Sequence, residues 1–271
     1  MKKVTLILCV LSCIGCRGDK KPVSHRIVQP EFQAIIDSSD VSGAILFYDL
    51  NKDIYHSNDF EWTHKGKLPA STFKIANSII GLETGIIENA NAIFKWDGNE
   101  KWLKVWEQDL VLKDAFQYSC VHCYQEIARD IGVQRMNNYL SKLDYGNFKV
   151  DSTNIEDFWL VGESRVSQMQ QIDFLKRFYL NELPISNKTS ETVKNIMFIE
   201  EGDDYKLSGK TGLSNANQIY NGWYIGYIET QNNTYFFATN LEPKEGFTLN
   251  TFIKKRIDLT KSAFKSINVL N

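Results

Sequence analysis

A serine and a lysine stand three positions apart, as Ser71 and Lys74, in the stretch KLPASTFKIANSIIGLETG. Residues at this spacing lie on one face of a helix, so the hydroxyl and the amine would be neighbours. The apolar residues around Lys74 predict a buried helix, with a side-chain oxygen of Ser71 or Thr72 capping its N-terminus. A buried lysine next to a hydroxyl can lose its proton and act as a base, and the serine can then act as a nucleophile.

The Ser-x-x-Lys pattern is common, and it recurs near the C-terminus as Ser262 and Lys265. Its ordinary interpretation is a serine that caps a helix and a lysine on the surface. Only the first copy is followed by further motifs along the chain. In chain order these are Ser119-Cys120-Val121, Tyr145-Gly146-Asn147 and Lys210-Thr211-Gly212. S-x-x-K together with K-T-G is typical of serine β-lactamases and penicillin-binding proteins.

The whole set resembles the class D, or oxacillinase-type, serine β-lactamases. Val121 stands where penicillin-binding proteins usually carry Asn, and DFWLVG places Trp159 and Leu160 where this family has its omega-loop pair. NGWYIGYIE is similar to the family's Trp-containing strand after K-T-G. The resemblance covers almost the whole chain after the N-terminal segment. It implies hydrolysis of small-molecule β-lactam antibiotics, and so antibiotic resistance.

The resemblance also implies catalytic roles. Ser71 would form the acyl-enzyme, Lys74 would be the general base for acylation and deacylation, and Ser119 would pass a proton to the leaving nitrogen. In the family this lysine carries a carbamate made from carbon dioxide, and no other cofactor is implied. The residues expected to support the carbamate are Val121, Trp159 and Leu160.

Substrate binding is expected along the K-T-G strand. Lys210 and Thr211 would bind the substrate carboxylate next to Gly212, and the backbone N–H groups of Ser71 and Leu213 would form the oxyanion hole. The family usually adds an arginine from the C-terminal helix. The sequence TFIKKRIDL leaves three residues open for this role, which are Lys254, Lys255 and Arg256.

The same motifs fit two other kinds of protein. A β-lactam sensor domain acylates and stays acylated, and it normally ends a longer membrane protein. A penicillin-binding transpeptidase would favour Ser-x-Asn as the middle motif and usually has extra domains. A generic esterase would carry G-x-S-x-G, which does not occur in the sequence. We therefore expect an enzyme that turns over.

The N-terminus is typical of an export signal. Lys2 and Lys3 precede a short apolar run, and we expect residues 1–15 to be a signal peptide. Gly15-Cys16 resembles a bacterial lipoprotein processing site, with Cys13 as a rival and plain cleavage as the simplest alternative. We expect an exported, periplasmic protein that is anchored to the membrane by a lipid at Cys16.

After Cys16, the remaining cysteines are Cys120 and Cys123, with His122 between them. A C-x-x-C pair can form a disulfide, a redox motif or part of a metal site, and the simplest interpretation is two buried thiols. No second Cys/His pair and no H-E-x-x-H pattern accompany it, so we expect no catalytic metal.

Composition limits the other classes. The chain has 271 residues, of which 43% are hydrophobic, and its net charge of −2 comes without a basic stripe, so we expect no nucleic-acid partner. A monomer and a homodimer both remain open.

The elements that must position these residues follow from the pattern along the chain. Two strands are predicted between residues 41 and 59, and three more between 205 and 242. Helices are predicted for most of 86–150, for about 167–183 and from about 248. We therefore expect an α+β fold, in which an antiparallel sheet from the N- and C-terminal segments is flanked by helices. A helical lobe, at about 86–165, would be inserted in a single catalytic domain spanning 16–271.

Overall fold

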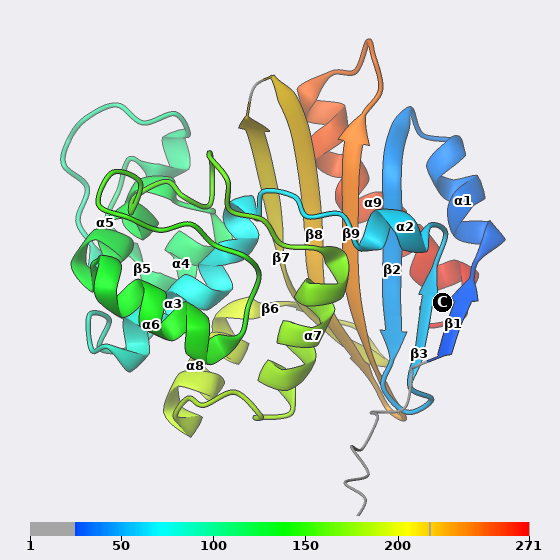
Figure 1. The fold of residues 1–271 in the computed structure, drawn as a ribbon, viewed down its shortest axis with the longest axis horizontal. Coiled ribbons are helices and arrows are strands. Elements are labelled where there is room, and N and C mark those ends of the chain that lie inside the picture. The colour runs from blue at the N-terminus through cyan, green and yellow to red at the C-terminus, as the bar shows by residue number, and fades with distance from the viewer. Residues whose placement is uncertain (1–24, 217, 271) are drawn as a thin grey trace, which may run out of the picture.

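A seven-stranded sheet runs through the molecule, and helices cover both of its faces (Figure 1). The computed structural model describes residues 25–216 and 218–270, so the expected signal peptide and Cys16 lie outside the described residues. In spatial order the strands are β1 (His25–Val28), β3 (Ile54–Ser57), β2 (Val41–Asp49), β9 (Thr234–Pro243), β8 (Ile219–Thr230), β7 (Tyr205–Ala216) and β6 (Phe198–Glu201).

The sheet is built from both ends of the chain, as predicted. Its centre is the antiparallel pair of β2 and β9, in which Val41 lies opposite Pro243 and Asp49 opposite Tyr235. The neighbouring pairs are antiparallel as well, except that β1 runs parallel to β3. The prediction of an antiparallel sheet is therefore confirmed, with the edge strand β1 as the exception.

Alternate side chains of strand β2 belong to two separate hydrophobic cores, one on each face of the sheet. Ile45 and Phe47 face α1 (Pro30–Asp37) and α9 (Leu249–Ser266), where the Phe47 ring stacks on Phe264 at 4.4 Å. Leu46 and Tyr48 belong to the core on the other face, which includes α7 (Gln168–Tyr179). A strand buried on both faces has a continuous apolar sequence, as β2 does.

The helical lobe lies beside β7 and β6 (Figure 1). Its elements are the 3₁₀ turn η1 (Ala70–Phe73), α3 (Lys74–Glu83), β4 (Ile93–Phe94), the 3₁₀ turn η2 (Lys104–Trp106), β5 (Leu110–Val111), α4 (Leu112–Gln117), α5 (Val121–Ile131), α6 (Val133–Leu143) and α8 (Asn187–Met197). A short helix, α2 (Phe60–Thr63), lies near β2.

The prediction of a mainly helical segment over 86–150 was wrong for 86–111. This stretch forms the small β4–β5 sheet and turns. Carboxylates there bind the backbone, since the Trp96 N–H donates to Asp109 at 3.0 Å and the Asn99 N–H to Asp97 at 3.1 Å. Such side-chain bonds compete with the helix ladder.

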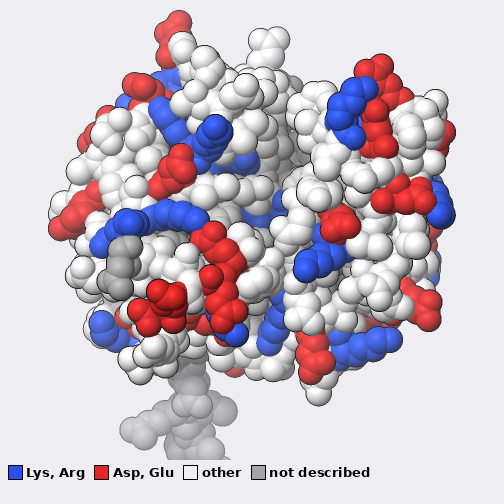
Figure 2. All heavy atoms as spheres, turned by 180° about the vertical axis from the view of Figure 1, so that it is seen from behind, with Lys and Arg blue, Asp and Glu red and all other residues white. Residues whose placement is uncertain are grey.

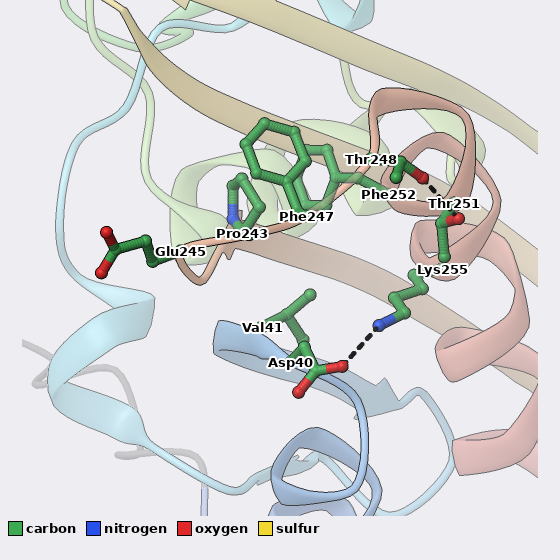
Figure 3. A pocket seen from close by; sticks show the side chains of 10 residues that line it. Asp40, Val41, Pro243, Glu245, Phe247, Thr248, Thr251, Phe252 and Lys255 are labelled. Carbon is green, nitrogen blue, oxygen red and sulfur yellow. Dashed lines mark hydrogen bonds and ion pairs between the residues drawn. The ribbon is translucent and has the colours of Figure 1, made fainter.

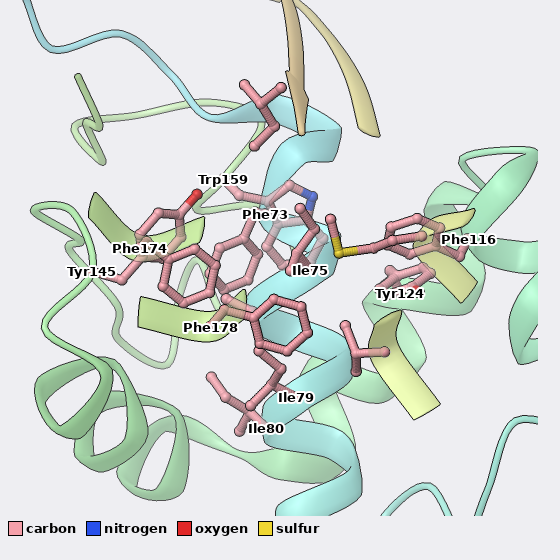
Figure 4. Packing of buried hydrophobic residues seen from close by; sticks show 14 of the residues in the cluster. Phe73, Ile75, Ile79, Ile80, Phe116, Tyr124, Tyr145, Trp159, Phe174 and Phe178 are labelled. Atoms are coloured by element: carbon pink, nitrogen blue, oxygen red, sulfur yellow. The ribbon is translucent and has the colours of Figure 1, made fainter. Parts of the chain in front are cut away.

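Helix α3 enters the core of the lobe as predicted, because its residues from Lys74 to Gly81 are all buried. Aromatic side chains from α4, α5, α7 and the 145–160 region surround it (Figure 4). No helix in the described part of the chain is long and apolar enough to cross a membrane. On the face shown in Figure 2, Lys and Arg side chains are interspersed with Asp and Glu.

Candidate active site

Ser71 lies in the 3₁₀ turn η1, which runs directly into α3. The serine is 8% exposed. Its predecessor Ala70 has a left-handed backbone with φ +50°, a conformation that costs a non-glycine residue about 1–2 kcal/mol. The N–H of Ala70 donates to the carbonyl oxygen of Trp159 at 2.9 Å, which ties this turn to the omega loop. The surroundings thus hold Ser71 at the head of α3.

The expected capping by Ser71 or Thr72 was wrong. The residue at the cap position of α3 is Phe73, and no side chain accepts a hydrogen bond there. The Thr72 hydroxyl instead donates to the carbonyl of Pro69 at 2.7 Å, inside the turn. A 3₁₀ turn continues the helix backward, so the first N–H groups of α3 need no cap of this kind.

A buried chain of hydrogen bonds supports this turn from α7. The Tyr145 hydroxyl donates to Oε1 of Gln171 at 2.7 Å, and Nε2 of Gln171 donates to Oγ1 of Thr72 at 2.9 Å. Tyr145 begins the Tyr-Gly-Asn motif, so this motif is linked through Gln171 to the turn that carries Ser71. Gln171 was missed by the sequence analysis, because a single glutamine carries no motif.

Lys74 is fully buried at the start of α3. Its Nζ has no hydrogen-bond partner among the described residues and lies 4.4 Å from the centre of the Tyr124 ring. Burial, with a smaller effect from the charge of Lys210, holds the pKa of Lys74 well below its usual range. The lowered pKa favours the neutral amine of Lys74, which is the form that can accept a proton or react with an electrophile.

The indole of Trp159 is a second unsatisfied polar group next to this lysine's helix. Its ring stacks on Phe73 with the centroids 5.5 Å apart (Figure 4), and the side chain is fully buried. Its Nε1–H has no acceptor within the described chain. A buried donor without an acceptor costs about 1–3 kcal/mol, so the indole N–H of Trp159 is a polar group that the described residues leave unsatisfied. Val121 and Leu160, both half-buried, pack against the same core.

Ser119 stands between α4 and α5 with a left-handed backbone of φ +54°. It accepts a hydrogen bond from Nζ of Lys210, which reaches across from β7 and also donates to the carbonyl of Thr211 at 3.0 Å. Burial, and to a smaller extent the charge of Arg256, lowers the pKa of Lys210 to about 7. Ser119 is thus hydrogen-bonded to an amine that can gain or lose a proton near neutral pH.

Strand β7 lies directly against the turn that carries Ser71. A Cβ at Gly212 would lie 3.1 Å from the carbonyl oxygen of Pro69 and 3.1 Å from Cγ2 of Thr72. A Cβ at this position would require the strand or the turn to shift by a few tenths of an ångström. Thr211 and Leu213, on either side of Gly212, are half-buried and follow the strand past the turn. The K-T-G motif is therefore next to Ser71 in space.

Arg256 is the cation of the C-terminal helix that faces this strand. Its guanidinium is buried, and Nη1 donates to the carbonyl of Gly212. Lys254 is exposed, and Lys255 binds the carbonyl of Ser39 on the other side of the helix. Helical spacing from Phe252 to Arg256, both buried, would have revealed this register.

Lys255 lines the hollow drawn in Figure 3, between the start of β2 and the N-terminal end of α9. It forms an ion pair with Asp40 at 3.8 Å, and Phe247 and Phe252 form the apolar wall. None of the motif residues lines this hollow. It is therefore separate from the site around Ser71.

Cys120 and Cys123 form a disulfide, so the interpretation as two buried thiols was wrong. The cause is the helix start, where residues 120 and 123 lie one turn apart with their Cα atoms 5.5 Å from each other. His122 completes a group whose ligand atoms lie within 4.8 Å of one another. With both sulfurs in the disulfide, the group offers no thiolate to a metal.

The arrangement supplies the parts of a covalent acyl-transfer site. The hydroxyl of Ser71 lies one turn from the buried amine of Lys74, whose pKa is lowered. A second hydroxyl, that of Ser119, is hydrogen-bonded to another amine, and a guanidinium is hydrogen-bonded to strand β7. Such a site can activate a nucleophile, move a proton to a leaving group and bind an anionic substrate.

Comparison with known proteins agrees with this chemistry. Residues 43–267 match the model of the penicillin binding protein transpeptidase domain. The chain is 41% identical to β-lactamase OXA-10 from Pseudomonas aeruginosa over 205 residues, which cover 74% of this chain and 77% of that protein. It is also 34% identical to the regulatory protein BlaR1 from Bacillus licheniformis over 213 residues, which cover 78% of this chain but 35% of that protein.

Solved structures give the same result. The crystal structure of a class D β-lactamase from Sebaldella termitidis superposes with a TM-score of 0.87 at 32% identity, covering 92% of this chain and all of that one. Its fold is the mixed sheet flanked by helices that is described above, which confirms the predicted fold class. On both sequence and structure, the chain belongs to the class D serine β-lactamases, a family of hydrolases within the penicillin-binding transpeptidase fold.

Proposed function

We propose that this protein hydrolyses β-lactam antibiotics through an acyl-enzyme on Ser71 and so confers antibiotic resistance. The observation that carries this proposal is the state of Lys74, which is fully buried one turn from Ser71 with a pKa far below that of a free lysine. A neutral lysine in this place can take the serine's proton, whereas an ammonium could not. The family to which the chain belongs points to the same substrates.

In acylation, the Oγ of Ser71 attacks the carbonyl carbon of the β-lactam ring, and its proton goes to the base at Lys74. The negative charge on the carbonyl oxygen is stabilised by the backbone N–H groups of Ser71 and Leu213, an effect of about 3 kcal/mol for each donor. The carbon–nitrogen bond of the ring then breaks. Ser119 gives its proton to the leaving nitrogen and regains one from the ammonium form of Lys210, to which it is hydrogen-bonded.

We further infer that the working form of Lys74 carries a carbamate formed from carbon dioxide. The residues present fit this group: the Trp159 Nε1–H is a buried donor that lacks an acceptor among the described residues, and Val121 and Leu160 would shield the carbamate from water. The carbamate would supply an oxygen base for both acylation and deacylation. Burial favours it, because carbon dioxide reacts with the neutral amine and not with the ammonium.

We assign substrate binding to two cations near strand β7, which are Lys210 and Arg256. Lys210 and Thr211 would bind the carboxylate that β-lactams carry next to the ring, and Gly212 allows the strand to lie against the nucleophile's turn. Arg256 is buried without an acidic partner in the described chain, and its guanidinium would add the second positive charge. A guanidinium can form a bidentate pair with a carboxylate, which a lysine cannot.

The alternative is a β-lactam sensor that acylates and does not turn over, or a penicillin-binding protein. The similarity to the regulatory protein BlaR1 supports the sensor as the alternative function. Against a penicillin-binding protein, the middle motif has Val121 in place of Asn. Export to the periplasm, with a lipid at Cys16, remains a proposal that concerns residues outside those described.

The test measures penicillin consumption and the mass of the protein in parallel. The purified protein should destroy many equivalents of a penicillin, and a short pulse should reveal one acyl adduct on Ser71. Ser71→Ala should abolish both. Ser262→Ala is the matched control, because Ser262 heads the other Ser-x-x-Lys copy on the exposed side of α9 and should retain full activity. An adduct that forms once and persists would instead make the protein a sensor or a penicillin-binding protein.

A further inference from the structure

The catalytic motif contains a disulfide that the mechanism above does not use. It joins Cys120 to Cys123 and so encloses Val121 and His122, immediately after Ser119. Both cysteine side chains are buried, at 0% and 1% exposure. A covalent bond inside the Ser-x-Val motif therefore links the serine's turn to the first turn of α5.

The disulfide restrains the backbone next to Ser119, which sets the orientation of the serine side chain. Ser119 is held at φ +54°, and the N–H of the next residue, Cys120, donates to the carbonyl of Ala115 at 2.8 Å. Cys120 is also the N-cap of α5, where its sulfur accepts the N–H of Cys123 at 3.3 Å. Ser119, with its left-handed backbone, is thus held on one side by α4. On the other side it precedes Cys120, whose sulfur is held in place by the disulfide.

A disulfide at this spacing contributes little to overall stability. Its closed loop has a sequence separation of only 3 residues, and the entropy that a cross-link removes from the unfolded chain grows with loop length. Its effect is therefore expected mainly on local geometry. In an active site this matters, because a misplacement of about 1 Å can cost about 10²-fold in rate.

The sulfur of Cys120 has polar groups around it that would stabilise a thiolate. The sulfur lies at the positive end of α5 and receives a backbone N–H, and both ring nitrogens of His122 lie 3.5–3.6 Å away. Stabilising a thiolate in this way makes a disulfide easier to reduce, because that sulfur becomes the better leaving group. Burial limits access to both sulfurs, so that only a small reductant or a local opening of the α5 start would allow attack.

We propose that the Cys120–Cys123 disulfide is a redox-sensitive positioning element for Ser119, which raises the rate of acylation when oxidised. A dithiol reductant would attack Cys123, and Cys120 would leave as the thiolate. The second thiol of the reductant would then displace the Cys123 sulfur. Overall, two electrons and two protons pass from the dithiol to the protein, which ends with two thiols while the reductant ends as a disulfide.

The inference rests on the proposed function, because Ser119 must act on the leaving nitrogen for its position to matter. Acylation should depend on the disulfide more than deacylation does, since the ring nitrogen leaves in the first step only. A general loosening of the lobe would instead slow both steps. The ratio of the two rates therefore separates positioning from stability.

The experiment uses the full chain with Cys9→Ser, Cys13→Ser and Cys16→Ser, so that the only cysteines left are Cys120 and Cys123. One portion is kept oxidised and another is treated with dithiothreitol, and alkylation followed by mass spectrometry counts the thiols. The acylation rate with a penicillin should fall by about tenfold or more on reduction, and recover on reoxidation. The deacylation rate should change much less.

The control is the same chain with Cys120→Ser and Cys123→Ser added. It should acylate as slowly as the reduced protein and should not respond to dithiothreitol, with a circular dichroism spectrum that shows it folded. The proposal is overturned if two free thiols leave the acylation rate unchanged, if dithiothreitol cannot open the bond in the folded protein, or if both rates fall equally. An oxidised protein that does not acylate at all would overturn the proposed function itself.

Discussion

The amine of Lys210, on strand β7, donates a hydrogen bond to the hydroxyl of Ser119, in the turn before α5. The two residues are 91 positions apart in the chain and belong to the sheet and the helical lobe. Because burial lowers the pKa of Lys210 to about 7, both its ammonium form and its neutral amine form are present near neutral pH. It joins the strand that we propose to bind substrate to the serine that we propose to deliver a proton.

Penicillin binding should weaken above neutral pH. Below the lowered pKa of about 7, Lys210 is an ammonium that attracts the substrate carboxylate. Above it the amine is neutral and must take up a proton on binding, which weakens the affinity by up to about tenfold per pH unit. Equilibrium binding in a Ser71→Ala background, measured between pH 6 and 9, checks this. Lys210→Arg keeps its charge throughout and should show a flat profile; equal slopes in the two proteins would contradict the assignment.

Arg256→Ala should raise the KM for a penicillin by about ten- to hundredfold, because a hydrogen bond to a charged group is worth about 1.5–3 kcal/mol. The turnover number should fall less, since Arg256 is not placed at the reacting bond. Lys254→Ala, an exposed change on the same helix, should leave both constants as they are. Steady-state kinetics, with thermal unfolding to show that each variant is folded, decides between them. A KM that does not move in Arg256→Ala would remove this residue from the binding site.

Trp159→Phe should slow deacylation by about 10²-fold and acylation by less. Phenylalanine retains a ring on Phe73 but lacks the indole N–H, which is the buried donor proposed to hold the carbamate on Lys74. The exposed Trp102, at 75%, offers a control, and Trp102→Phe should deacylate normally. Rapid-quench mass spectrometry gives both rates. Normal deacylation in Trp159→Phe would mean that the indole does not support the base.

Cys16→Ala should release the protein from membranes into the periplasmic fraction. The reason is the Gly15-Cys16 junction after a short apolar segment, which fits lipid attachment at that cysteine. Fractionation of cells that express the wild type, Cys16→Ala and Cys13→Ala checks this. If the wild type is already free in the periplasm, or if only Cys13→Ala is released, the anchor at Cys16 is wrong.

The five central strands of the sheet could be predicted because each carries its own signal, whereas the edge strands β1 and β6 were not predicted. The apolar run of β2 and the aromatic strands β8 and β9 are readable locally, and their occurrence at both ends of the chain implied one sheet. The segment 86–111 could not be predicted as well. Its turns depend on carboxylates such as Asp97 and Asp109 that bind the backbone, and composition alone does not show whether such residues will do so.

The candidate site could likewise be predicted only in part from the sequence. The motif residues Ser71, Lys74, Ser119 and Lys210 could be chosen because their types and order are specific, and the structure brings them together, although their roles stay predictions. The residues that support them come from distant segments without a motif, as Gln171 does from α7. The disulfide was one of several open interpretations, because bonding between two cysteines depends on the local backbone and the redox environment.

The most direct test of the account follows the acyl group on Ser71 with and without carbon dioxide. A long penicillin pulse in carbon dioxide-free buffer lets the unmodified Lys74 amine, a weaker base, support slow acylation of Ser71. The adduct is then followed by mass spectrometry after bicarbonate is added or withheld. We predict that the adduct persists without bicarbonate and clears when it is supplied, because the base at Lys74 then re-forms. Clearance at the same rate in both samples would contradict the proposed base.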